Sequence, residues 1–306
     1  MEEVSITLTQ SLALYEKPGW ASSTKKDYVR DFKYFATNWE ERRQEVFDLK
    51  KISDRDLRDY QDYLQGELGL RTSSVEKKLA PLRFIFKQAL RKRWIMENPI
   101  EELRRIKHVE TAPRSLSKNE QAALMRVIKK ELEVALLRYP TRWRTYQRDA
   151  SLVDFLLNTG LRVNEACEVR LGDIQLSERK GNLLVRKGKG RKERRVPLNL
   201  HARHALQEWL AVRPESDTDH LWTAVERGNG ALSERSVQRI LARYKTLAGL
   251  ERFSPHICRH TFAKNLIDEG AGLEKVAKLL GHANLNTTRI YITPTEHDLA
   301  LAVEKL

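Results

Sequence analysis

The chain has little cysteine, and it lacks both a long apolar run and a signal-peptide pattern. Its 306 residues include two cysteines, Cys167 and Cys258, which are too few for a disulfide framework and suit a reducing cytoplasm. No apolar stretch approaches the roughly 18 residues of a membrane-spanning helix, and the first residues, Met1-Glu-Glu-Val, do not begin a secretory signal. These absences argue against a disulfide-stapled secreted domain and a membrane protein, and they predict a cytoplasmic protein.

Positive charge, by contrast, is abundant and unevenly distributed. The formal net charge is +14 and the pI is about 9.7. Residues 1–110 hold 22 Lys and Arg against 19 Asp and Glu, whereas residues 111–306 hold 34 against 23. Such an excess favours a polyanionic partner for the second part of the chain. A solvated basic surface without a ligand is the alternative.

The first third of the chain has the pattern of a helical domain. Ser and Thr residues stand where helix N-caps are expected, and apolar residues follow at helical spacing. The predicted helices are 7–16, one starting at Ser23-Thr24, one capped by Ser53, and one from Ser73-Ser74 to near Trp94. We therefore expect a four-helix module over residues 1–106. A linker follows at 107–116, which has no helical period and contains Pro113.

Residues 117–306 predict a second domain that is mainly helical. Ser117 and Glu120 have the spacing of a capping box. An apolar helix at 151–158 can end at Gly160 in the left-handed conformation, and Asn164 can cap the next helix. Later helices are expected at 201–212, 233–248, 255–268, 273–280 and 286–292, with a last amphipathic piece from 297.

One strand pair stands out among these helices. Residues 182–186 and 194–198 flank Gly188-Lys189-Gly190, which predicts a hairpin tip. A second unusual segment is 131–149, where aromatic residues alternate with arginines. It can lie along a phosphate backbone or form a surface helix and loop, and the sequence leaves the two open.

Five polar side chains in the second domain suit a phosphate ligand. Arg162 and Arg259 are guanidiniums that can each fork onto two oxygens, His256 and His282 add imidazoles, and Tyr291 adds a phenol. Ser254-Pro255 starts a helix just before His256 and Arg259, so both lie near its electropositive end, which favours an anion. A tyrosine hydroxyl beside a held phosphate is a potential nucleophile.

The order and spacing of these residues resemble the tyrosine recombinase, or phage-integrase-type, family. Five motifs carry the resemblance, in the family's order: Thr159-Gly160-Leu161-Arg162-Val163-Asn164-Glu165; Gly188-Lys189-Gly190-Arg191-Lys192-Glu193-Arg194 with Val196-Pro197-Leu198; His256-Ile257-Cys258-Arg259-His260-Thr261-Phe262-Ala263; Leu279-Leu280-Gly281-His282-Ala283; and Thr287-Thr288-Arg289-Ile290-Tyr291. The resemblance implies a fold that is mainly α with a small β-sheet. A helical SAM-like core-binding domain would precede a mixed α/β catalytic domain.

The resemblance also implies a role for each residue of the site. Arg162 and Arg259, helped by His282, would neutralise a scissile phosphate, and Tyr291 would attack it to give a 3′-phosphotyrosine. Lys189 would protonate the leaving 5′-oxygen, and His256 would accept the tyrosine proton. Glu165 would orient Arg162 or a neighbour. Cys258 and His260 are expected to be scaffold.

The predicted hairpin tip contains other cations besides Lys189, so more than one residue can be assigned as the general acid. Lys189 is one of seven basic residues in 186–195, and Lys187 or Lys192 remains an alternative general acid. We expect Lys187, Arg191, Lys192 and Arg194 to contact DNA.

The expected partner is double-stranded DNA that carries specific recombination sites. By resemblance, four protomers, identical or paired with a paralogue, exchange strands through a Holliday junction in a cytoplasmic, nucleoid-associated complex. The tail 297–306 presents Leu299, Leu301, Ala302 and Leu306, and we expect it to dock on a neighbouring protomer. We expect no cofactor or metal, and no Walker-type phosphate-binding motif occurs.

Three rival interpretations remain at this level. A zinc site could be imagined from His256, Cys258, His260 and His282, but the zincin pattern and a Cys-x-x-Cys pair are both missing. The chain could also be a non-catalytic DNA-binding protein of the same fold. A type IB topoisomerase, which would relax DNA without a specific site, is the third.

Overall fold

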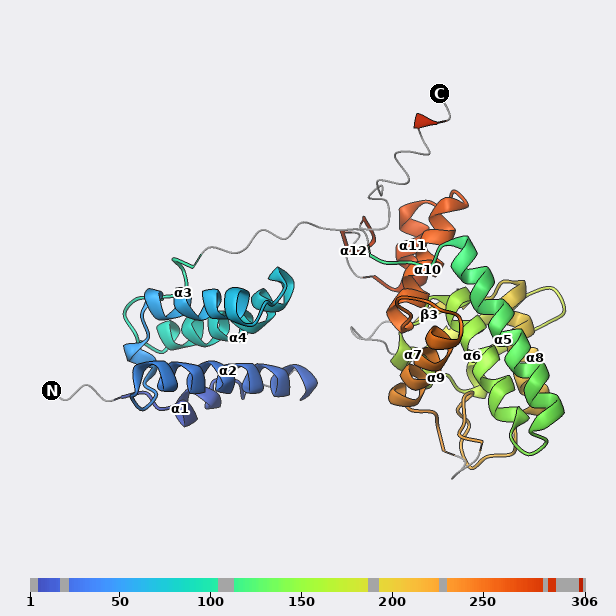
Figure 1. Ribbon diagram of the computed structural model, residues 1–306, viewed down its shortest axis with the longest axis horizontal. Coiled ribbons are helices and arrows are strands. Elements are labelled where there is room, and N and C mark those ends of the chain that lie inside the picture. Colours follow the sequence, from blue (N-terminus) through green and yellow to red (C-terminus); the bar gives the residue numbers. More distant parts are fainter. Residues whose placement is uncertain are drawn as a thin grey trace. The chain divides into compact units, whose positions relative to one another are not determined.

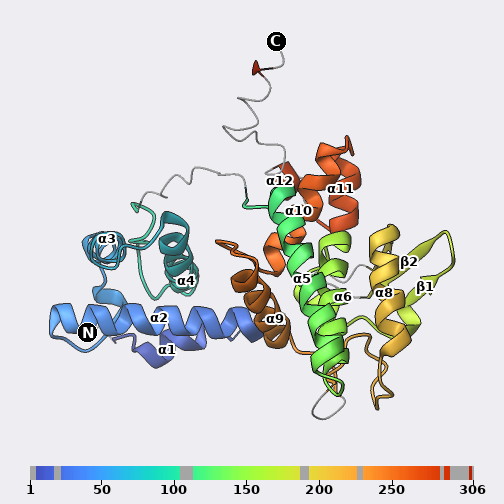
Figure 2. The same cartoon turned by 45° about the vertical axis from the view of Figure 1, so that its right-hand side comes forward.

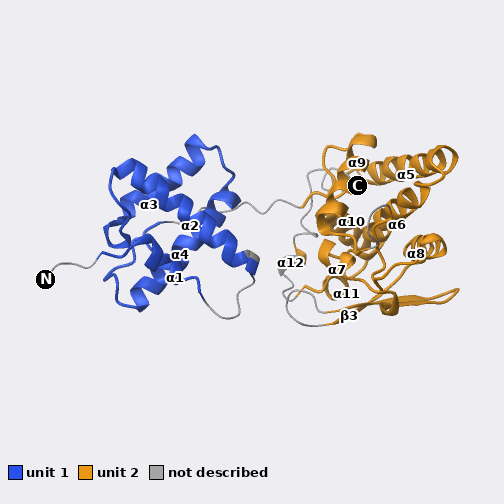
Figure 3. Cartoon of the chain, turned by 90° about the horizontal axis from the view of Figure 1, so that it is seen from below, with its two compact units in different colours: residues 1–109 blue, residues 110–306 orange. Residues whose placement is uncertain are grey.

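The computed structural model describes residues 5–16, 22–103, 113–186, 193–225, 230–282, 286–289 and 303–304. The chain separates into two compact units, residues 1–109 and 110–306 (Figure 3). Each unit has its own apolar core. Within the described residues, no helix is both long and apolar enough to cross a membrane.

The first unit is entirely helical in its described part (Figure 1). Both α1 and α3 begin at capping boxes, formed by Thr7 with Gln10 and by Ser53 with Asp56. The predicted cap at Ser53 is therefore confirmed. The elements are α1 (Leu8–Ala13), α2 (Ser22–Arg43), a 3₁₀ turn (Leu49–Lys51), α3 (Asp54–Asp62), a π turn (Tyr63–Glu67) and α4 (Thr72–Arg91).

Aromatic side chains fill the core of the first unit. Tyr15 is fully buried after α1, and its ring stacks on Phe84 of α4 at 5.5 Å between centroids. Its hydroxyl donates to the carbonyl oxygen of Pro81 at 2.9 Å. One side chain thus joins the first helix to the last, and its buried polar end is satisfied.

The second unit consists of eight helices and a small sheet among the residues described (Figure 2). The central helix is α6, most of whose side chains are buried and which packs against α5, α8 and α10. The elements are α5 (Lys118–Arg138), α6 (Trp143–Thr159), α7 (Val163–Cys167), a 3₁₀ turn (Leu171–Asp173), β1 (Ile174–Leu176), β2 (Gly181–Val185), β3 (Arg194–Pro197), α8 (Leu200–Val212), α9 (Glu234–Leu247), α10 (Pro255–Asp268), α11 (Leu273–Leu280) and α12 (Asn286–Arg289).

The sheet is antiparallel in the order β1-β2-β3. The predicted pairing of β2 with β3 is confirmed, and its register places Leu183 opposite Val196 on the buried face. The sequence interpretation missed β1, because three residues are too few to show an alternating pattern. The hairpin tip at 188–190 lies outside the described residues.

The segment 131–149 resolves into helix, short turn and helix. The α5 helix continues to Arg138, and α6 already begins at Trp143, so the predicted start at Ser151 was wrong. The rings of Tyr139 and Tyr146 stack at 5.9 Å, and the guanidinium of Arg243 in α9 lies 4.8 Å from the centre of the Tyr146 ring. These side chains brace α6 against α9. Aromatic and cationic residues that pack through stacking do not produce the apolar period that marks a helix in sequence.

Candidate active site

The ends of three helices meet around the guanidinium of Arg259. This side chain lies on α10 and is 4% exposed. Its Nη1 donates to the carbonyl oxygen of Gly160 and its Nη2 to that of Leu280, both at 2.7 Å. Those carbonyls belong to the C-terminal ends of α6 and α11, where no intrahelical donor remains. A cation is favoured there by the helix dipoles, and Arg259 thereby joins three helices.

Gly160 allows α10 and α11 to pack closely against the end of α6. It ends α6 with φ +62°, as the sequence predicts, and the Cβ of any other residue would lie 2.3 Å from Phe262 Cδ1 and 2.9 Å from Leu280 Cδ2. Both the left-handed backbone and the packing therefore require glycine.

Arg162 begins the next helix, α7. Its backbone N–H donates to Glu165 Oε2 at 2.9 Å, and its Nη1 donates to Oε1 at 3.0 Å. Arg162 is the N-cap residue, so the predicted cap at Asn164 was wrong: Glu165, at the third helical position, captures the amide of Arg162. The Arg162 side chain nevertheless stays 33% exposed.

Arg194, the first residue of β3, reaches the same carboxylate from the sheet. Its Nη1 and Nη2 donate to Glu165 Oε1 and Oε2 at 2.9 and 2.8 Å, and its Nε donates to the carbonyl oxygen of Leu279 at 2.9 Å. Only 12% of this side chain is exposed. The sequence predicts a DNA contact for Arg194, and that contact remains a prediction. The partners seen here all lie within the protein.

Glu165 is held ionised by these contacts. Burial acts to raise its pKa, but the hydrogen bonds from Arg194 and from the Arg162 backbone, together with both guanidinium charges, outweigh it and lower the pKa to about 2. The site therefore keeps one carboxylate between two guanidiniums at any physiological pH.

His282 lies just beyond the end of α11, after Gly281 with φ +68°. Its Nδ1 is 2.8 Å from the hydroxyl oxygen of Thr288, a fully buried residue of α12. Partial burial lowers the pKa of His282 to about 4, and the charges of Arg259, Arg162 and Arg194 act in the same direction. The imidazole is thus neutral at pH 7 and stands within the field of all three arginines.

His256 and Arg259 share α10 but differ in burial. Ser254 caps the helix and Pro255 is its first residue, as predicted. His256 in the first turn is exposed, whereas Arg259 is buried. Cys258 is buried in the core, as expected, and burial raises its thiol pKa. His260 is also largely withdrawn from solvent, and burial with the charges of His256 and Arg259 lowers its pKa to about 4.

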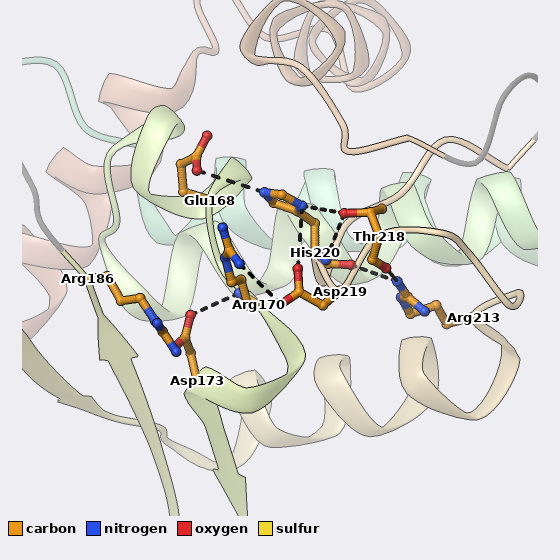
Figure 4. A network of polar contacts seen from close by, with 8 residues as sticks. All are labelled: Glu168, Arg170, Asp173, Arg186, Arg213, Thr218, Asp219 and His220. Atoms are coloured by element: carbon orange, nitrogen blue, oxygen red, sulfur yellow. Dashed lines mark hydrogen bonds and ion pairs between the residues drawn. The ribbon is translucent and has the colours of Figure 1, made fainter.

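The connection between β2 and β3 is anchored at its β2 end by a second polar network (Figure 4). Arg186, which follows β2, donates through Nε to Asp173 Oδ1, and the backbone N–H of Arg170 donates to Asp173 Oδ2 at 3.0 Å. The Asp173 carboxylate is buried in the 3₁₀ turn before β1. At the other end of the connection stands Arg194 with its bonds to Glu165 and Leu279. Both roots of the predicted hairpin are therefore tied to the body of the unit.

Several predicted site residues lie outside the described residues. They are Lys187, Lys189, Arg191, Lys192 and Tyr291. Of those that the structure does describe, Arg162, Glu165, Arg194, Arg259 and His282 form one group, whereas His256 stands exposed in the first turn of α10. The sequence interpretation missed Thr288 as the partner of His282 and Asp173 as the anchor of Arg186. Thr288 stood within a quoted motif, but Asp173 carried no signal.

The chemistry of this group is that of an oxyanion site. Arg162 and Arg194 bond a single carboxylate, the buried Arg259 adds a third guanidinium, and a neutral imidazole adds a hydrogen-bonding group. Such a set can stabilise charge that develops on phosphate oxygens. Among the described residues, no cluster of three or more His, Cys, Asp or Glu side chains is placed to hold a metal ion.

Comparison with known proteins agrees with this chemistry. Residues 116–297 match the Phage integrase family, and residues 14–109 match the Phage integrase SAM-like domain. The chain belongs to the phage integrase family. It is a tyrosine-type site-specific DNA recombinase, as the sequence resemblance implies.

Individual relatives cover nearly the whole chain. The protein named tyrosine recombinase XerC from Anoxybacillus flavithermus is 32% identical, over 98% of this chain and 96% of its own length. That from Syntrophus aciditrophicus is 32% identical, over 89% and 87%. Their similarity shows that the family resemblance is not confined to the five motifs.

Solved structures share the fold. A XerH site-specific recombinase bound to a palindromic difH substrate, in a post-cleavage complex, has a TM-score of 0.76 and 24% identity over 97% of this chain and 84% of that one. The Tn1549 transposon integrase in complex with a circular intermediate DNA has a TM-score of 0.72 and 17% identity over 98% and 99%. The predicted fold class, a helical SAM-like domain with a mixed catalytic domain, is confirmed.

Proposed function

We propose that this recombinase cuts and rejoins DNA at specific sites through a covalent 3′-phosphotyrosine on Tyr291, with no metal ion and no ATP. The observation that supports this most is the convergence of Arg162 and Arg259 on neutral His282, which stands within the field of both guanidiniums. A phosphodiester resists attack because its negative charge repels nucleophiles. Fixed guanidiniums can neutralise that charge as it grows in the pentavalent transition state.

The bond changes balance within this set of residues. The phenolic oxygen of Tyr291 bonds to phosphorus as the bond to the 5′-oxygen breaks. His256 accepts the phenolic proton, and Lys189 gives a proton to the departing 5′-oxygen. The products are a 3′-phosphotyrosine and a free 5′-hydroxyl. Because the ester energy stays in the covalent link, the reverse steps reseal the strand without ATP.

His282 supplies a hydrogen bond rather than a charge. With its pKa near 4, it is neutral at pH 7 and carries one ring proton. If the Thr288 hydroxyl donates to Nδ1, the ring proton stays on Nε2, which can donate to a phosphate oxygen. The contact at 2.8 Å between Nδ1 and the hydroxyl oxygen has the length of a hydrogen bond, and this tautomer is the one that leaves an N–H for the phosphate.

The DNA partner follows from charge. Lys187, Arg191 and Lys192 of the predicted hairpin tip would contact the phosphate backbone beside the scissile bond, in a salt-dependent way. Four protomers, identical or paired with a paralogue, would exchange strands through a Holliday junction. The tail 297–306 would dock on a neighbouring protomer.

A suicide substrate tests the chemistry directly. On a nicked DNA site from which the released oligonucleotide diffuses away, the wild-type protein should accumulate a covalent adduct in EDTA and without nucleotide. Tyr291→Phe should bind the same DNA and form none. No adduct from the wild-type protein on its own genomic target would mean a DNA-binding protein without catalysis. Relaxation of supercoils without a specific site would indicate a topoisomerase.

Removal of residues 297–306 tests the assembly. The shortened protein should bind one half-site with wild-type affinity and fail to form the complex of two sites, which native gel electrophoresis separates. Unchanged recombination would contradict a docking role for the tail.

A further inference from the structure

Arg194 occupies a position that the proposed chemistry leaves without a role. All three nitrogens of its guanidinium have acceptors inside the protein: both oxygens of Glu165 and the carbonyl oxygen of Leu279. These acceptors lie on α7, whose N-cap residue is Arg162, and at the C-terminal end of α11, which His282 follows. We propose that Arg194 is a positioning residue, which sets Arg162 and His282 for the scissile phosphate. This inference rests on the proposed function.

The first effect concerns the charge of Arg162. Glu165 is the one carboxylate that the described contacts give to Arg162, and its side chain is 2% exposed. Arg194 takes both carboxylate oxygens in a forked pair, whereas Arg162 makes one side-chain bond. Without Arg194, the buried carboxylate would have Arg162 as its one guanidinium partner. It would then compete with the phosphate for the Arg162 guanidinium. Arg194 therefore leaves Arg162 available to the substrate.

The second effect concerns the position of His282. The Nε of Arg194 holds the carbonyl of Leu279, and the guanidinium lies directly under Gly281, where an added Cβ would be 3.0 Å from Nη1. His282 is the next residue, and the adjacent carbonyl of Leu280 is the one that Arg259 binds. The end of α11 is thus fixed by two arginines, one from β3 and one from α10.

Lysine cannot replace this arrangement. One ammonium is a point charge and cannot present parallel N–H groups to a carboxylate while a third N–H meets a carbonyl. Arg194→Lys therefore keeps the charge and loses the geometry, whereas Arg194→Met keeps the approximate length and loses both. Arg195, the next residue of β3, is exposed and provides a control, because Arg195→Met removes the same charge from the same strand.

Single-turnover cleavage of the suicide substrate at saturating DNA tests the proposal. We expect Arg194→Met to cleave about 100-fold more slowly than wild type and Arg194→Lys about 10-fold more slowly. Arg195→Met should stay within about 3-fold. A substrate with a methylphosphonate at the scissile position lacks the negative charge that Arg162 neutralises, so the deficit of Arg194→Met should shrink to about 10-fold on it.

A double-mutant cycle adds a readout that does not depend on the methylphosphonate substitution. In a Glu165→Gln background no carboxylate competes for Arg162, so Arg194→Met should cost about 10-fold or less there. Equal losses in both backgrounds and on both substrates would mean that Arg194 only stabilises the fold, and cleavage at the rate of Arg195→Met would also overturn the proposal. If wild type itself formed no adduct in the same gel, the proposed function would fail instead.

Discussion

Glu165 accepts two parallel hydrogen bonds from the guanidinium of Arg194, at 2.9 and 2.8 Å, although the residues are 29 positions apart in the chain. This pair joins α7 to the sheet and leaves Arg162 as the most exposed member of the arginine group. The surroundings of Arg162 therefore depend on a contact between two residues that are distant in the sequence.

The ionisation of Glu165 predicts a pH dependence of stability. Because folding lowers its pKa from 4.5 to about 2, the ionised form stabilises the fold fully above pH 4.5. That contribution, about 3 kcal/mol at most, is lost as the pH falls from 4.5 towards 2. We expect the free energy of unfolding in urea to fall more steeply with acidification in wild type than in Glu165→Gln. Parallel curves across that window would contradict the assignment.

Gly160 and Gly249 allow backbone strain to be separated from packing. Both have left-handed φ values, +62° and +63°, but an added Cβ would meet Phe262 and Leu280 at Gly160 and nothing within 4 Å at Gly249. Gly249→Ala should cost about 1 kcal/mol for the backbone alone. Gly160→Ala should cost about 2 kcal/mol more, because the packed neighbours must move. Urea denaturation of both variants measures the difference, and equal costs would show that the site tolerates a Cβ.

The hydroxyl of Thr288 should matter for catalysis. Thr288→Val keeps the shape and removes the partner of His282 Nδ1, so the contact proposed to keep the ring proton on Nε2 is lost. We expect cleavage to slow by about 10-fold, with DNA affinity unchanged. Thr288→Ser retains the hydroxyl and should recover most of the rate. A serine variant as slow as the valine variant would point to packing rather than to the hydrogen bond.

Asp173 should affect the leaving-group step, since it anchors Arg186 at the β2 end of the connection in which Lys189 lies. Asp173→Asn is expected to slow cleavage of normal DNA by about 10-fold. A substrate with sulfur in place of the bridging 5′-oxygen needs no proton from Lys189 and should be cleaved at close to the wild-type rate. Asp219→Asn, at an exposed member of the same network, is the control. Failure of the sulfur substrate to restore the rate would remove Asp173 from this role.

The sequence by itself determined the class of fold and the family, and it selected the residues of the proposed site. Arg162, Arg259, His282 and Tyr291 are informative because guanidinium, imidazole and phenol are suited to phosphate, and because their order along the chain is that of the family. Local signals such as Ser254-Pro255 before α10 and Gly160 after α6 located helix ends, since capping acts over a few residues.

Only the tertiary structure decided which charged residues pair with each other. Arg194 stands in a run of cations that is equally consistent with DNA contact, and its sequence neighbours give no hint of Glu165 or Leu279. Asp173 and Arg186 likewise meet only because β1 and β2 pair. Ion pairs across distant segments depend on how helices and strands pack, and a local pattern does not record that. The arginines proposed to meet the phosphate could be chosen from sequence, whereas the contacts of Arg194 with Glu165 and Leu279 could not.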